Sequence, residues 1–141
     1  MGAGTIDLLK QSYRLDLDGI IKGAIVDVEK GEFVGERYRI DTPQPAKPEP
    51  VAKVVAEIVQ HFDYSGPIGV TFPSIMQNGI ALTAANVDDD FIGVNISELI
   101  QNETGFPTIT LNDADAAGIA EVEFGAGKSH QGSVIVLTLG T

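Results

Sequence analysis

The sequence has 141 residues, no cysteine and a formal net charge of −11, with 43% hydrophobic and 21% charged residues. This composition is that of one globular domain, or a large piece of one, with enough chain to bury a core. The lack of cysteine excludes disulfides and thiolate chemistry and fits a reducing cytoplasm, where we expect the protein to act. The acidic balance argues against a nucleic-acid partner, and no window approaches the length of a membrane-spanning helix, so no membrane partner is expected.

The first third of the chain is predicted to form strands joined by tight turns. Two apolar-rich runs flank Asp18 and Gly19, a pair that suits a turn with positive φ, and they predict a hairpin. Residues 31–40 predict a third strand. Residues 41–50 hold most of the prolines and predict a stiff surface connection within the domain.

From residue 51 the apolar spacing becomes helical, and helices then alternate with strands. Pro50 is placed to start the first helix, and Asn78-Gly79 is the turn signal of a second hairpin. The expected elements are helices over 51–62, 95–104 and 113–124, strands over 68–72, 108–112 and 132–140, and the hairpin within 74–86. This order predicts an α/β fold whose mixed sheet has three antiparallel N-terminal strands and helices on both faces.

The junction of the strand 108–112 with the next helix places Asn112 and Asp113 at a strand end. An acid there can cap the helix, because its oxygen accepts a hydrogen bond from an unpaired N–H of the first turn. It can also be a catalytic base, because ligand sites of α/β sheets collect outside the carboxyl ends of the strands. The residues alone favour the cap.

Two other kinds of site are not supported by the sequence. The two histidines, His61 and His130, have no second metal ligand at helical or hairpin spacing, which argues against zinc and against a Ser-His-Asp triad. The segment FGAGKSHQG resembles a Walker loop only superficially, since the template needs glycine where Val122 stands. We therefore expect a solvent-exposed connecting turn there.

The first predicted hairpin, LDLDGIIKGAIVD, has the parts of a phosphate site. It carries an acid on its first strand (Asp16), a glycine at its turn (Gly19) and a lysine just beyond (Lys22). Backbone N–H groups of such a turn can hold phosphate, and the acid can position hydrated magnesium. A plain hairpin with solvated acids is the alternative. Asn86, after the second hairpin, could bond a polyol or satisfy its own turn.

Seven segments, taken in order, resemble one family. They are IKGAIVD, TPQPAKPEPVAKVVAEIV, GVTFPS, NGIALTAAN, LNDADAAGIAE, FGAGK and GSVIVLTLGT. They are similar to the ROK sugar kinases, and among these to the bacterial polyphosphate glucokinases, over nearly the whole chain. The resemblance implies an actin-like, ribonuclease H-like ATPase lobe. Residues 1–141 would form a single N-terminal lobe of a two-lobed kinase.

The resemblance also implies roles for individual residues in holding the sugar. Asp113, in the segment LNDA, would be the general base for the sugar hydroxyl. Asn112 and Asn86, together with Asp113, would bind glucose hydroxyls.

A second set of implied roles concerns the phosphoryl donor. Asp16 would help to place Mg²⁺ and phosphate, beside Gly19 and Lys22. Gly140 and Thr141 would open a second phosphate loop. The first hairpin departs from the family pattern, because it is one residue shorter and has Asp18 where a glycine is usual.

The implied reaction moves a phosphoryl group from polyphosphate or ATP to the 6-hydroxyl of glucose with Mg²⁺. Because the chain stops at the second phosphate loop, we expect a catalytic half that lacks a C-terminal lobe; homodimers are common in the family. Two alternatives remain: a non-catalytic, sugar-binding module like the sugar-responsive repressors of the family, and an inactive fragment.

Overall fold

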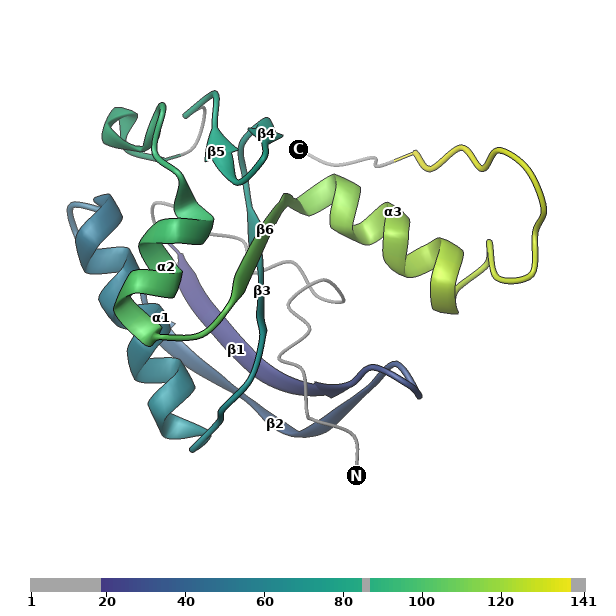
Figure 1. Ribbon diagram of the computed structural model, residues 1–141, viewed down its shortest axis with the longest axis horizontal. Coiled ribbons are helices and arrows are strands. Elements are labelled where there is room, and N and C mark those ends of the chain that lie inside the picture. Colours follow the sequence, from purple (N-terminus) through teal and green to yellow (C-terminus); the bar gives the residue numbers. More distant parts are fainter. Residues whose placement is uncertain (1–18, 85–86, 138–141) are drawn as a thin grey trace.

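A computed structural model describes residues 19–84 and 87–137, which alternate between strands and helices (Figure 1). The strands are β1 (Ile20–Asp27), β2 (Glu32–Asp41), β3 (Ile68–Phe72), β4 (Met76–Gln77), β5 (Ile80–Ala81) and β6 (Thr108–Asn112). The helices are α1 (Pro48–His61), α2 (Ile96–Thr104) and α3 (Asp113–Phe124), with a 3-10 turn, η2 (Asp89–Phe91). The α/β class is confirmed, and none of these helices is long and apolar enough to cross a membrane.

β1 and β2 form an antiparallel hairpin that α1 covers on one face. The helix approaches closely at Gly23, where an added Cβ would overlap Cγ2 of Ile58. At the end of α1, the exposed His61 ring stacks on Tyr38 with the ring centroids 3.6 Å apart. β2 confirms the strand that the sequence predicts over residues 31–40. The close packing of α1 on both strands fixes the hairpin against the helix.

β3 and β6 form a parallel pair between the helices. Their register runs from Ile68 opposite Thr108 to Phe72 opposite Asn112, so both strands end at the same edge. α2 is held to one face by a hydrogen bond of 3.0 Å from the Ser97 hydroxyl to Thr110 Oγ1. Figure 1 shows α1 and α2 on one side of the pair and α3 on the other. Every residue of β3 is buried, as its unbroken apolar run predicts.

The local signals predicted most boundaries well. β3, β6 and α3 lie where the sequence predicts them, and the second hairpin turns at Asn78 and Gly79, which have φ of 51° and 82°. α1 begins at Pro48, three residues before the predicted start. Proline is tolerated in the first turn because its missing N–H would have no helical partner there.

The prediction of a last strand over residues 132–140 is wrong for residues 132–137, the part of it that the structure describes. They form no strand, and Ile135 and Leu137 are 85% and 79% exposed. A strand needs a neighbour for its backbone groups, and the described part of the chain offers none beside this run. The run lies along α3 instead.

The strands form three separate two-stranded sheets among the described residues: β1–β2, β3–β6 and β4–β5. The first strand of the predicted Asp18-Gly19 hairpin lies outside the described residues. The largest fully buried side chains are Phe72, Phe91, Ile68 and Ile100, which join β3 to η2 and α2 in one core.

Candidate functional site at the strand ends

Asn112 closes β6 and caps α3. Its Oδ1 accepts hydrogen bonds from the backbone N–H groups of Ala114 (2.9 Å) and Asp115 (3.3 Å). The cap that the sequence predicts at this junction therefore falls on Asn112, and Asp113 is the first residue of the helix. Two N–H groups that an α-helix cannot satisfy internally are thereby paired.

The same side chain joins the two strand ends. Asn112 Nδ2 donates to the carbonyl oxygen of Ser74 at 2.8 Å, and Ser74 follows β3 by two residues. An amide carries two N–H donors, and among the described residues the second one has no partner. The Asn112 amide, which the family resemblance implies to hold a glucose hydroxyl, is thus positioned by one N–H and keeps its second N–H for a ligand.

Ser74 is buried and connects this edge to the β4–β5 hairpin. Its Oγ donates to the carbonyl oxygen of Thr83 at 2.6 Å and accepts from the Thr83 N–H at 3.2 Å. Thr83 Oγ1 in turn accepts from the N–H of Ile75 at 3.1 Å. Thr83 stands three positions before Asn86, which lies outside the described residues. No local pattern predicts this connection, because it joins residues nine positions apart.

Asp113 is half-buried at the N-terminus of α3. One carboxylate oxygen, Oδ1, accepts from the N–H of Ala114 at 2.9 Å. No ion pair among the described residues involves this carboxylate. The carboxylate lies in the first turn of α3, at the positive end of the helix dipole. A carboxylate held this way at the edge where two parallel strands end has the chemistry of a proton acceptor.

The predicted phosphate residues divide between described and undescribed parts of the chain. Gly19 precedes β1, and its carbonyl oxygen accepts from the N–H of Thr42 at 3.0 Å. Lys22 is paired in register with Arg39, so two cations lie on one face of the hairpin. Neither has an ion pair with a described carboxylate. Arg39 is an additional cation that the sequence analysis did not single out.

Four predicted site residues lie outside the described residues: Asp16, Asn86, Gly140 and Thr141. A magnesium site can be sought only among the described residues, and there no three His, Cys, Asp or Glu side chains are grouped to hold a metal ion. Of the predicted site residues that the structure describes, Asn112 and Asp113 lie together, and Ser74 joins them through its hydrogen bond to Asn112.

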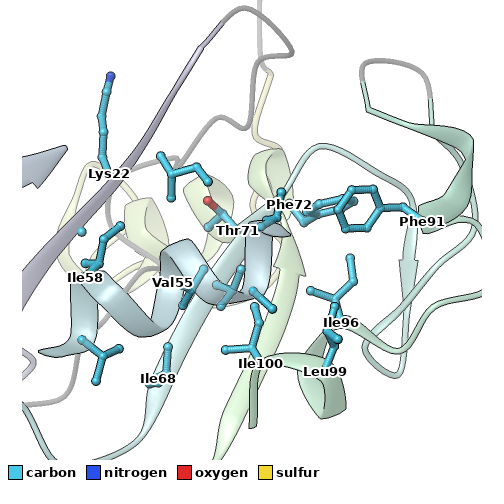
Figure 2. A pocket seen from close by; sticks show the side chains of 16 residues that line it. Lys22, Val55, Ile58, Ile68, Thr71, Phe72, Phe91, Ile96, Leu99 and Ile100 are labelled. Atoms are coloured by element: carbon cyan, nitrogen blue, oxygen red, sulfur yellow. The ribbon is translucent and has the colours of Figure 1, made fainter. Parts of the chain in front are cut away.

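One apolar cavity is part of the core and is too small to be the sugar site. It lies between β1, β3, α1 and α2 and is lined mainly by apolar side chains, including Ile58, Ile68 and Phe91 (Figure 2). Its volume of about 40 Å³ has room for a water molecule or two but not for a hexose. Lys22 lies at its rim, and Figure 2 shows its ammonium group pointing away from the apolar side chains.

Residues 19–141 match the ROK family. The chain belongs to this family. It is 48% identical over 134 residues to the polyphosphate glucokinase of Mycobacterium tuberculosis strain H37Rv, covering 94% of this chain and 51% of that protein. The chain thus spans about half the length of this curated relative.

Two solved structures share the fold. The inorganic polyphosphate/ATP-glucomannokinase of Arthrobacter sp. strain KM superposes with a TM-score of 0.75 at 46% identity, covering 80% of this chain and 47% of that one. A ROK family glucokinase from Streptomyces griseus, in complex with glucose and AMPPNP, superposes with a TM-score of 0.67 at 24% identity, covering 79% and 35%. The architecture is therefore that of the ROK sugar kinases.

Proposed function

We propose that this chain is the N-terminal catalytic half of a sugar kinase that transfers a phosphoryl group from polyphosphate or ATP to the 6-hydroxyl of glucose. The observation that carries the proposal is the 48% identity to a polyphosphate glucokinase over 94% of the chain. The strand-end arrangement of Asn112 and Asp113 supports it, because it supplies a fixed carboxylate and an amide donor side by side.

Asp113 is the proposed general base. Its carboxylate takes the proton of the glucose 6-hydroxyl while that oxygen bonds to phosphorus and the bond to the leaving phosphate breaks. Phosphoryl transfer asks a protein chiefly for positioning and charge stabilisation. We propose that Asn112 and Asn86 hold other hydroxyls of the sugar, with Asn112 kept in place by Ser74.

The donor is proposed to bind beside β1, where Gly19 and Lys22 lie and where Arg39 adds a second cation. Asp16 is the proposed Mg²⁺ residue, and the ion would supply charge neutralisation on the phosphates. Gly140 and Thr141 are proposed to begin a second phosphate loop. The identity of the donor stays open between polyphosphate and ATP, and a cytoplasmic location stays a prediction.

We also propose that residues 1–141 are a single actin-like lobe, with one mixed sheet that has three antiparallel N-terminal strands and helices on both faces. The strand pairs β1–β2 and β3–β6 support this, because one strand of each pair, β1 and β3, lines the same apolar cavity. A C-terminal lobe is the proposed partner, in keeping with relatives about twice as long. Dimerisation of the assembled kinase is a further prediction.

The test is a glucose 6-phosphate assay on a fusion in which this chain replaces the matching half of the M. tuberculosis relative, with polyphosphate and ATP supplied separately. Asp113→Asn should lower turnover by about 10²–10⁴-fold, the usual contribution of a positioned base, with glucose affinity unchanged. Asp115→Asn is the matched control, because Asp115 is an exposed acid in the same helical turn. Near-normal turnover of the Asp113 variant, or equal losses in both, would contradict the assignment.

A further inference from the structure

Lysine and arginine side chains gather on one face of the β1–β2 hairpin. Tyr38 stacks on His61 of α1, so its side chain points to the face that the helix covers. Side chains alternate between the two faces of a strand, so Arg37 and Arg39, its neighbours on β2, point to the opposite face. Lys22 is paired with Arg39 in the register and shares that face. We call Lys22, Arg37 and Arg39 the hairpin cations; they are three of the nine lysines and arginines of the chain.

This grouping of like charges does not stabilise the hairpin. Like charges directly opposite each other on paired strands are destabilising, and the chain has 20 acids with which such a face could be balanced. No ion pair among the described residues involves a hairpin cation. The guanidinium of Arg37 lies 4.8 Å from the centroid of the Phe33 ring, which holds the side chain in place without neutralising its charge. A role in binding an anion accounts for the grouping.

The positive charge is local and persists within an acidic chain. Asp41 lies on the same face at the end of β2, opposite Ile20, so the hairpin cations and this acid carry a net charge of +2. At physiological ionic strength, charges are screened beyond about 8 Å. A ligand at the hairpin therefore senses this set more strongly than the distant acids that give the chain its formal charge of −11.

The hairpin cations form a row that leads away from Gly19, the residue proposed to lie at the donor phosphate. Strands rise about 3.3 Å per residue, so the pair of Lys22 and Arg39 lies about 10 Å along β1 from Gly19. Arg37 is two residues further along β2, which adds about 7 Å. A row of this length exceeds the triphosphate of a nucleotide and suits a linear chain of many phosphates.

The described part of this face is poorly suited to a nucleic acid, the other common linear polyanion. Proteins hold single strands by stacking the bases on exposed aromatic rings. The ring of Phe33 lies under the guanidinium of Arg37 and is not open to a base. The arrangement thus favours a polyanion without bases.

We propose that the hairpin cations bind the phosphates of an inorganic polyphosphate chain that lie beyond the phosphate to be transferred. The inference rests on the proposed function for the position of the reacting end of the donor. It adds the surface that holds the remote part of the donor, and it makes Arg37 a residue that selects long polyphosphate over short donors. Arginine and lysine form strong charge-assisted hydrogen bonds with phosphate oxygens, and each such contact makes affinity fall with salt.

The experiment titrates long-chain inorganic polyphosphate and inorganic triphosphate into the 141-residue chain at several salt concentrations, without glucose, and measures affinity by calorimetry. Arg37→Gln should weaken binding of the long chain about two- to fivefold, as for an exposed charge contact. It should also lower the slope of log affinity against log salt by about one. Binding of triphosphate should stay unchanged. Because Arg37 is exposed, the variant should keep the circular dichroism spectrum of the parent.

Two further variants separate this surface from the overall charge of the chain. Asp41→Asn removes the acid from the same face and should strengthen binding of the long chain, the opposite direction to Arg37→Gln. Lys53→Gln is the matched control, because Lys53 is an exposed cation on α1, which covers the other face of the hairpin. It removes the same charge as Arg37→Gln and should leave both affinities unchanged.

Binding is read without turnover, so the two proposals can fail separately. Long-chain binding that is weakened by Arg37→Gln, with no kinase activity in the fusion described above, supports the surface and counts against the proposed function. An active fusion whose KM for polyphosphate does not respond to Arg37→Gln overturns the surface and leaves the proposed function standing. Equal losses in the Arg37 and Lys53 variants also overturn the surface. So do equal losses for the long chain and triphosphate, no binding of the long chain by the parent, and tighter binding of single-stranded DNA.

Discussion

Asn112 gives the sharpest test of how the strand ends are held together. In Asn112→Ala, the N–H of Asp115 loses its cap and the N–H of Ala114 keeps only the Asp113 carboxylate, which together costs about 1 kcal/mol. The carbonyl oxygen of the buried Ser74 loses its 2.8 Å hydrogen bond, and an unsatisfied buried group costs a further 1–3 kcal/mol, roughly. The expected loss is therefore about 2–4 kcal/mol of the free energy of unfolding.

Asn112→Ser separates the two contributions. Serine caps helices about as well as asparagine but is too short to reach Ser74, so this variant should lose only the interaction with Ser74. The two variants should differ by about 1 kcal/mol. Urea titration followed by far-ultraviolet circular dichroism measures both, with unchanged slopes showing that the unfolded states are comparable. A serine variant no more stable than the alanine variant would refute the cap, and one as stable as the parent would refute the contribution of the Ser74 contact.

Two more perturbations test the packing and the surface charges. Gly23→Ala should cost about 1–3 kcal/mol because its Cβ overlaps Ile58; in a double-mutant cycle with Ile58→Ala the losses should be less than additive. The carboxylate of Asp90, hydrogen-bonded to Lys47 at 2.6 Å, raises the pKa of that amine above its ordinary 10.5. Because this pKa is raised on folding, the stability it contributes is present below pH 10.5 and is lost as the pH rises through the folded-state pKa. The urea midpoints of the parent and Asp90→Asn should converge above that pH, and a gap that widens there would contradict the linkage.

The elements that could be predicted are those whose signals are local. α3 begins where Asn112 can cap and its first turn is acidic, and the second hairpin turns where Asn78 and Gly79 tolerate positive φ. β3 is a short apolar run bounded by proline and glycine. Each of these elements begins or turns at a signal within about one helical turn of its boundary, so the sequence alone could predict it.

What could not be predicted depends on distant partners. The run 134–137 has the composition of a central strand, but strand formation needs a neighbour that the described residues do not supply. The bond between Asn112 and Ser74 joins residues 38 positions apart. It exists because the parallel register sets Asn112 opposite Phe72, and no local pattern fixes that register.

The division of roles at the junction explains how one strand end can serve both folding and chemistry. A polar residue must satisfy the first N–H groups of α3, and Asn112 does so while remaining neutral. Asp113, one position later, gains the favourable field of the helix terminus but is not needed as the cap. Replacing it by asparagine should therefore change stability by only a few tenths of a kcal/mol, roughly, as for exposed charges near a helix end. A large loss of turnover in Asp113→Asn would then report on proton transfer and not on unfolding.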